Sequence, residues 1–393
     1  MGFSAFDYLI LIVYLIGVTL FGVYFRRTQS TIKDYFLGSR NVSWVVIGLS
    51  IVATETSTLT LIGVPALAYS TYARPEQGGN FTYIQVVIGY IIGRVIVSLI
   101  LIPAYFKGEC STAYELLGRI FGPAAKRVAA GMFLVMRALA EGVRVFAASL
   151  VLSAVLAAGL SGLHHLWLWS ILIVGALTLI YTFEGGISAV IWTDLIQLII
   201  YIGGALIATY ELIHLIPGGW TGFVATAGAA GKFKAFSFSA DITSPFTFWG
   251  GVVGGTFFTL ASHGTDQLIV QRLLASRSRR DSQKALILSG VVVFLQFALF
   301  LGIGTMLFAY YTHVPLAQPL ATSDQVFPTF IVQRLPHGIA GLVIAAIFAA
   351  AMSNLSGSLN ALSSSTLLDL YQPVRARKNE EALLRTSRWF TAA

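Results

Sequence analysis

Nine apolar segments constrain this chain more than any other feature of its sequence. Each is close to or above the roughly 20 residues that a helix needs to cross a bilayer. They cover residues 6–25, 42–68, 81–106, 128–158, 166–183, 189–216, 245–270, 285–311 and 338–370. Soluble domains carry about 25% charged residues, whereas this chain of 393 residues carries 11% and is 56% hydrophobic. We therefore expect an all-α polytopic protein embedded in a lipid bilayer.

The basic residues are distributed unevenly between the connections. Eighteen of the 25 Lys and Arg, Arg272 among them, fall in alternate connections, and four fall in the opposite ones. Arg94, Arg137 and Arg144 stand within apolar segments. Because cytoplasmic loops carry the excess of Lys and Arg, the sequence predicts an N-terminus outside the cell membrane. This topology accounts for the net charge of +8, so no nucleic-acid partner is expected.

An acid and five hydroxyls interrupt the second apolar segment. Residues 53–66 read ATETSTLTLIGVPA, with Glu55 among the hydroxyls and Gly63 and Pro65 expected to loosen the helix. A charged side chain at the bilayer centre costs roughly 2.5–3.5 kcal/mol, so it persists where it faces water, a partner helix or a cation. One interpretation is an ion site on a broken helix, where unwound carbonyls hold sodium. The other is that the hydroxyls bond to their own helix and join neighbouring helices.

Three further motifs complete a resemblance to the sodium:solute symporter family. Residues 185–197 read GGISAVIWTDLIQ, residues 264–267 and 271–272 read GTDQ and QR, and residues 350–355 read AAMSNL. The family contains sodium-coupled carriers of sugars, proline, sialic acid, vitamins and iodide. The resemblance implies the leucine-transporter-like fold, a five-plus-five inverted repeat preceded by one extra helix.

That fold divides the chain, a single transporter domain over 1–393, into three parts. Residues 6–25 would be the extra N-terminal helix, residues 42–216 the first inverted repeat, and residues 245–393 a partial second repeat. The chain stops at Ala393, where a further helix would begin. We therefore expect a C-terminally truncated sequence.

The resemblance also implies a sodium site. The family's common site corresponds to the backbone carbonyls of Ala53, Thr56 and Ala350 and to the side chains of Ser353 and Asn354. Asn354 stands where the family usually has a second hydroxyl. Its amide oxygen is still a ligand that a hard cation accepts.

In some family members a second sodium is ligated by the aspartate of the motif at 185–197 and by serines of the helix that carries the motif at 350–355. Asp194 and Ser356 occupy such positions here, but Gly357 stands where another hydroxyl is expected. The alternative for Asp194 is a salt bridge or a helix cap at the cytoplasmic surface. The sequence leaves both interpretations open and favours one sodium per cycle.

Three charged residues on the fourth apolar segment indicate a carboxylate site. Arg137, Glu141 and Arg144 are spaced so that they share one helix face. We expect Arg137 to pair with Glu141, which leaves Arg144 free to bind a carboxylate bidentately, as in the sialic acid branch that the chain resembles. The other residues expected to contact the solute are Glu55, Thr58, Thr82, Gln85, Thr259 and Ser262. Thr259 and Ser262 differ from the residues of sugar carriers, so a sugar is disfavoured.

These observations predict a sodium-coupled secondary active symporter that imports a small polar organic solute, with a carboxylate as one candidate, by alternating access. An alternative is the transporter-like sensor domain of a signalling protein. An integral-membrane enzyme would need His or carboxylate groups that converge at one membrane face, and the six His are scattered along the chain. With Cys110 as the only cysteine, neither a disulfide framework nor a cysteine metal site is possible.

Overall fold

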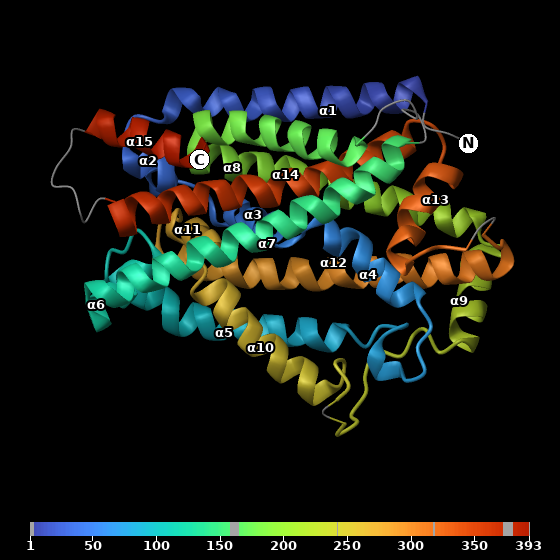
Figure 1. The fold of residues 1–393 in the computed structure, drawn as a ribbon. Helices are drawn as coiled ribbons and strands as arrows, with labels where there is room; N and C mark the ends of the chain where they lie inside the picture. Colours follow the sequence, from blue (N-terminus) through green and yellow to red (C-terminus); the bar gives the residue numbers. More distant parts are fainter. Residues whose placement is uncertain (1–3, 158–164, 242, 317–318, 372–379, 393) are drawn as a thin grey trace.

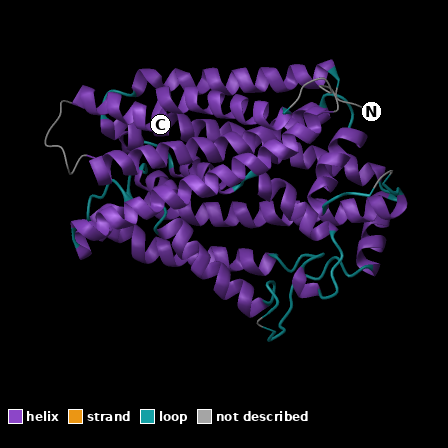
Figure 2. Cartoon of the chain, viewed as in Figure 1, coloured by secondary structure: helices purple, strands orange, loops and turns teal. Residues whose placement is uncertain are grey.

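The computed structural model describes residues 4–157, 165–241, 243–316, 319–371 and 380–392. These residues form helices joined by loops, and no β-strand occurs among them (Figure 2). The α-helices are α1 (Ala5–Tyr24), α2 (Ile32–Leu37), α3 (Trp44–Glu55), α4 (Thr58–Tyr69), α5 (Ile84–Lys107), α6 (Ala113–Phe121), α7 (Pro123–Ala157), α8 (Leu166–Leu215), α9 (Gly219–Ala229), α10 (Phe248–Gly264), α11 (Gln267–Leu274), α12 (Arg279–His313), α13 (Val326–Arg334), α14 (Ile339–Ser365) and α15 (Glu380–Ala392). The shorter turns are η1 (Phe25–Thr28), η2 (Gly38–Arg40), η3 (Pro75–Gln77), η4 (Ser323–Gln325) and η5 (Thr366–Tyr371).

The nine predicted segments all coincide with helices over the described residues, residue 158 lying outside them. Among the described residues, five helical stretches are long and apolar enough to cross a membrane, and the bent pair α3 and α4 makes a sixth. The predicted segments 166–183 and 189–216 both lie in α8, which changes direction at Gly186. This residue has φ 54°, and an added Cβ would lie 2.6 Å from the carbonyl oxygen of Tyr35. Glycine is therefore required at the bend.

The second predicted span is broken, as the sequence suggested, but not at the expected residues. Between α3 and α4 the chain bends by 66°, with Thr56 and Ser57 in extended conformations. The Ser57 hydroxyl then accepts the Thr60 N–H at 3.3 Å and caps the new helix, which satisfies one of its free donors. Gly63 and Pro65, expected to loosen the backbone, both lie inside the continuous helix α4.

The long helices pack in two groups (Figure 1). The first group consists of α3, α4, α5, α10 and α12, and the second of α1, α7, α8 and α14. Within the first, α5 and α10 approach so closely that a Cβ at Gly89 or Gly255 would lie 2.3 Å from a carbonyl oxygen of the other helix. Small residues allow such close packing in membrane helices.

Large apolar side chains cover the outer faces of both groups. Val13 of α1 is 62% exposed, Leu139 of α7 is 68% exposed and Phe257 of α10 is 68% exposed. Contiguous exposed apolar surface of this kind is typical of a membrane or protein interface. The short helices α2, α6, α11 and α15 lie at one end of the molecule, and α9, α13 and the N-terminus lie at the other (Figure 1).

Candidate functional site

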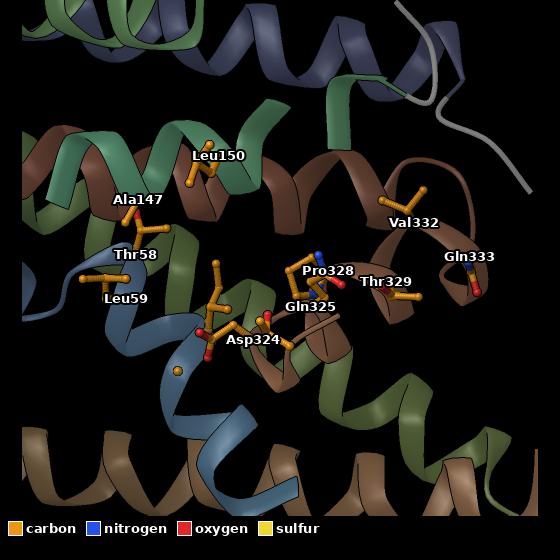
Figure 3. Close-up of a pocket in the computed structure, with 13 residues that line it drawn as sticks. Thr58, Leu59, Ala147, Leu150, Asp324, Gln325, Pro328, Thr329, Val332 and Gln333 are labelled. Atoms are coloured by element: carbon orange, nitrogen blue, oxygen red, sulfur yellow. The ribbon is translucent and has the colours of Figure 1, made fainter. Parts of the chain in front are cut away.

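A cavity of about 720 Å³ opens between α4, α7, η4 and α13 (Figure 3). We call it the vestibule, and its lining residues are Thr58, Leu59, Ile62, Gly63, Ala147, Leu150, Thr322, Asp324, Gln325, Pro328, Thr329, Val332 and Gln333. Its size is within the range of small-molecule sites, and its mixture of apolar walls with a few polar groups is typical of them. Asp324 is the charged residue of this lining.

Thr58 also lines a second, much smaller cavity, so this residue lies between the two spaces at the start of α4. The small cavity measures about 10 Å³ and includes Glu141, Arg144 and Asn354 in its lining. Its volume is that of roughly one water molecule. The vestibule therefore leads toward the break between α3 and α4, where Arg144 and Asn354 lie.

The structure brings the predicted sodium ligands together at this break. Ala53 and Thr56 belong to the end of α3, while Ala350, Ser353 and Asn354 lie on α14, and all five are buried. Asn354 joins the two helices directly, because its Nδ2 donates to the carbonyl oxygen of Thr54 at 2.8 Å. This carbonyl lies in the last turn of α3, where carbonyl oxygens have no N–H partner within the helix. The amide of Asn354 supplies that partner.

Arg144 of α7 contacts the same amide group. Its Nη1 donates to the Oδ1 of Asn354 at 2.9 Å, and it lies 4.0 Å from a carboxylate oxygen of Glu141. That carboxylate also accepts the hydroxyl of Ser358 at 2.8 Å. The Arg144 side chain is 35% exposed. The residue predicted to bind a carboxylate thus contacts Asn354, one of the predicted sodium ligands, and is partly exposed.

The predicted partner of Arg137 is wrong. Arg137 pairs with Asp266, which precedes α11, rather than with Glu141 on its own helix. Asp266 accepts the Leu268 N–H at 2.9 Å as well, and so also caps α11. The carboxylate that pairs with Arg137 therefore comes from another segment of the chain, and not from the residue one turn away on α7.

Asp194 lies in the interior rather than at the cytoplasmic surface. Its Oδ1 accepts the Ser353 hydroxyl at 2.6 Å, and its Oδ2 forms a salt bridge with Arg272 at 3.0 Å. The Ser356 hydroxyl instead donates to the Ser353 carbonyl at 3.0 Å. Arg272 was counted among the loop cations, but it is 1% exposed and belongs inside the helix packing.

Glu55 points away from the sodium ligands, toward α5 and α10. It pairs with Arg94 and lies 3.4 Å from the Nε2 of His263. Arg94 Nη2 is 3.0 Å from the same His263 nitrogen, and Ser262 Oγ is 2.9 Å from the Nδ1. If Arg94 donates to Nε2, the imidazole is neutral and its Nδ1–H donates to Ser262. Arg94 also donates to Ser289 of α12 at 3.2 Å.

Five of the predicted solute contacts are not lining residues of either cavity. Glu55 and Ser262 belong to the cluster with Arg94. Thr82 donates to the carbonyl of Pro75 at 3.1 Å, and Gln85 donates to the carbonyl of Phe246 at 2.8 Å. Thr82 and Gln85 therefore hydrogen-bond to the loops that precede α5 and α10. Thr259 packs against α5 at Gly93.

Sequence reasoning placed Arg94 at membrane depth without a partner and assigned Arg272 to a loop. A signal was present for Arg94, because a charged residue inside an apolar segment is rarely unpaired, but not for Arg272, which follows the apolar segment 245–270. Asp324, in the vestibule, had no such signal, since its neighbours in sequence form an ordinary polar loop. Its placement depends on how the loop before α13 folds against α4.

Comparisons with known proteins identify relatives for this arrangement. The profile of the sodium:solute symporter family matches residues 35–393. The chain is 32% identical to the sodium/sialic acid symporter SiaT of Proteus mirabilis, over 94% of this chain and 72% of that protein. It is 30% identical to the sodium/sialic acid symporter NanT of Aliivibrio fischeri, over 99% of this chain and 74% of that one. The human sodium/iodide cotransporter is 29% identical, over 94% and 56% of the two chains.

Two solved structures are also similar. A Na⁺-coupled sialic acid symporter in a substrate-bound outward-open state, described as revealing a novel Na⁺ site, aligns with a TM-score of 0.87 and 29% identity. The alignment covers 99% of this chain and 78% of that one. A nucleobase-cation-symport-1 family transporter, Mhp1, aligns with a TM-score of 0.55 and 14% identity, over 91% and 72% of the two chains. That second likeness concerns the fold alone.

Proposed function

Because this chain belongs to the sodium:solute symporter family, we propose that its solute is a small organic anion whose carboxylate binds Arg144. The chain is a multi-pass membrane protein and a sodium-coupled symporter rather than an enzyme. Its leucine-transporter-like fold is confirmed by the sialic acid symporter structure. The sensor alternative has no support among these relatives, all of which are carriers.

The observation that carries the proposal is the position of Arg144, between the vestibule and the sodium ligands. A guanidinium has five N–H donors, and the bond to Asn354 at 2.9 Å uses one of them. The nearest acid, Glu141, is 4.0 Å away and already accepts a hydroxyl. Arg144 can therefore receive a carboxylate in a bidentate pair. Relatives named for sialic acid and for monocarboxylates support this class of solute.

The same bond offers a route for coupling solute to sodium. The Oδ1 of Asn354 accepts a hydrogen bond from Arg144 in the structure. We propose this oxygen as a sodium ligand, together with Ser353 and the carbonyls of Ala53, Thr56 and Ala350. A carboxylate that binds Arg144 would draw the guanidinium away and release this oxygen to the ion. Each ligand then raises the affinity of the other, and by linkage the two effects are equal.

Residues that contact the solute are proposed to follow the path from the vestibule inward. Thr58 lines both cavities and is kept as a solute contact. Glu55 and Ser262 belong to the buried cluster with Arg94, and we propose a positioning role for them. The loop contacts of Thr82 and Gln85 support a role in holding the outer loops.

The remaining features are topological. We propose that the vestibule faces outside together with the N-terminus, and that basic loops at the α2 and α6 end face the cytoplasm. Residues 42–216 and 245–393 would be the two inverted repeats, the second one partial. Inward sodium movement would then supply about 2.3 kcal/mol per charge for each 100 mV of membrane potential.

Uptake by proteoliposomes tests the proposal. The probes are sialic acid, pyruvate and lactate, each paired with its neutral methyl ester, and uptake is measured with and without a sodium gradient. We expect sodium-dependent uptake of at least one acid and not of its ester. Arg144→Gln should weaken its binding by about 1.5–3 kcal/mol, or roughly 10- to 150-fold, the scale of a charged hydrogen bond.

The matched control is Arg119→Gln, which removes a half-exposed arginine from α6 and should leave uptake unchanged. Equal transport of acids and esters would contradict the proposal. So would an Arg144→Gln protein that transports the acid as the unchanged protein does.

A further inference from the structure

We infer that the exposed face of α12 binds one anionic phospholipid, whose phosphate contacts Arg280 and Lys284 and whose acyl chain lies along the apolar residues that follow. α12 runs from the α11 end of the molecule toward the α13 end (Figure 1). The inference concerns a lipid partner and uses neither the proposed solute nor the proposed sodium ligands. It depends on the proposed orientation only for the leaflet, which would be the cytoplasmic one.

Five exposed residues form a single stripe along α12. They are Arg280, Lys284, Ile287, Val291 and Leu295. Steps of three and four residues keep side chains on one face of a helix. The three apolar side chains are 42%, 50% and 62% exposed, in chain order. At about 1.5 Å per residue, the part of the stripe from Lys284 to Leu295 is about 16 Å long. One leaflet contributes roughly 15 Å of hydrocarbon, so this part of the stripe matches the depth of one leaflet.

The neighbouring helices hold α12 without covering the stripe. On one side α3 packs so closely that a Cβ at Gly48 would lie 2.8 Å from the carbonyl oxygen of Ala285. On α5, the carbonyl of Ser98 accepts the Nε2 of Gln283 at 2.6 Å. Both contacts lie at the level of the two cations. The start of α12 is therefore fixed in place while its stripe stays exposed.

The two cations at the start of the stripe have no acidic partner. No ion pair among the described residues includes Arg280 or Lys284. Lys284 instead lies over the ring of Trp44, with 5.8 Å between its Nζ and the ring centroid, which is within the range of a cation–π contact. Tryptophan is enriched at membrane–water interfaces. Its place beside Lys284 supports a position of both cations at the level of the lipid headgroups.

A phosphodiester is the anion that fits this pair of cations. Residues four apart on a helix have Cβ atoms about 5–6 Å apart, so both side chains can reach one phosphate. The guanidinium of Arg280 can bind two phosphate oxygens, and the ammonium of Lys284 adds a point charge. Residues 277–284 include four cations and one acid, so the local charge also favours an anion. A soluble phosphate or an acidic protein would use these charges alone, whereas a lipid also covers the adjoining apolar stripe.

Native mass spectrometry of the purified chain in micelles tests the inference. The probes are dioleoylphosphatidylglycerol and dioleoylphosphatidylcholine, which have the same tails. We expect the glycerol lipid to bind roughly 30-fold more tightly, about fivefold for each cation. Arg280→Gln with Lys284→Gln should bring the two affinities close together, whereas Arg280→Lys with Lys284→Arg should retain the preference. The control is Lys33→Gln with Arg127→Gln, which removes two exposed cations elsewhere and should leave the preference unchanged.

Two further probes separate a lipid from a soluble anion. Dihexanoylphosphatidylglycerol keeps the headgroup but has short tails, so it should bind more weakly than the dioleoyl lipid. Glycerol 1-phosphate has no tails and should not compete with the dioleoyl lipid. Equal binding of the short and long lipids would exclude the apolar stripe and overturn the inference. Competition by glycerol 1-phosphate would assign the cations to a soluble anion and also overturn it.

Equal affinity of the unchanged chain for the glycerol and choline lipids would overturn the inference without any variant having to fold. A preference that survives Arg280→Gln with Lys284→Gln would do so too, as would a preference that the control variant loses to the same extent. The assay contains neither solute nor a sodium gradient. Failure here is therefore distinct from failure of the carboxylate proposal.

Discussion

Replacing Arg94 by glutamine should destabilise the protein mainly through the acid it leaves behind. Arg94 is fully buried and pairs with Glu55, whose side chain is 18% exposed. Removing one partner of a buried ion pair costs about 3–5 kcal/mol, because the other charge is left without compensation. Glu55 lies 3.4 Å from His263, which can take up a proton and replace part of the lost charge. We therefore expect a loss of about 3 kcal/mol, at the lower end of that range.

The double variant Glu55→Gln with Arg94→Gln separates this effect from lost packing. Two neutral amides can hydrogen-bond to each other, so most of the stability should return and a deficit of about 1 kcal/mol should remain, the scale of one neutral hydrogen bond. The measurement is the free energy of unfolding of the purified protein in detergent micelles, from SDS titration followed by helical circular dichroism. The control is Arg119→Gln on exposed α6.

The reasoning fails if Arg94→Gln is as stable as the unchanged protein, because the pair would then contribute nothing. It also fails if the double variant is less stable than the single one. In that case the loss would come from packing or from the Ser289 contact, and not from a stranded carboxylate.

Two further predictions follow from other contacts. Asn354→Ser keeps an oxygen for the ion, but its side chain is too short to reach Arg144. Binding of ²²Na⁺ should therefore persist, while the increase in sodium affinity caused by a transported carboxylate should disappear. If the carboxylate raises sodium affinity as much as in the unchanged protein, Asn354 takes no part in the coupling. In the loop before α10, hydrogen bonds from Thr243 and then Ser244 lower the pKa of Asp241 to about 2. Because the folded pKa lies below the ordinary value of 3.8, this stabilising contribution is complete above that value and is lost as the pH falls toward 2. Cleavage by pepsin near Asp241 should therefore begin only toward pH 2, but already at pH 4 in Asp241→Asn, and identical pH profiles would refute the assignment.

The spans could be predicted from sequence because hydrocarbon imposes a length and a composition on every helix that crosses it. The break in the second span was likewise indicated by polar residues in an apolar run. Its position was not, since Pro65 looked like the stronger breaker. Pro65 removes a hydrogen bond inside α4, but it is buried where α12 packs closely against α4 at Gly304, and the helix continues through it.

Partners of the buried charges were beyond the reach of the sequence. Helical spacing predicted Arg137 with Glu141, because only partners on the same helix can be read from spacing. The actual partner, Asp266, lies on a different segment and becomes adjacent through tertiary packing. For the same reason Arg272 was counted as a loop cation, although its neighbours in the fold bury it. Asn354, which was matched to a family motif, does contact the end of α3, at the carbonyl of Thr54.

The ion pairs differ in whether they join one packing group or two, and this difference bears on alternating access. Arg94, Glu55 and His263 all lie in the group of α3, α5 and α10, so the cluster can persist if that group moves as a unit. Arg137 and Arg272 instead join α11, the continuation of α10, to α7 and α8 in the other group.

Both of these pairs lie toward the α11 end of the molecule, away from α4 and α13, which border the vestibule (Figure 1). The cavity thus lies toward the α13 end, and these two ion pairs join the packing groups toward the α11 end. Opening that end requires both pairs to separate. Asp266 would remain satisfied as the cap of α11, whereas Asp194 would lose Arg272, the cation with which it pairs. Separation at Asp194 is therefore the costlier step, and an ion released near Ser353 would be the cation best placed to offset it.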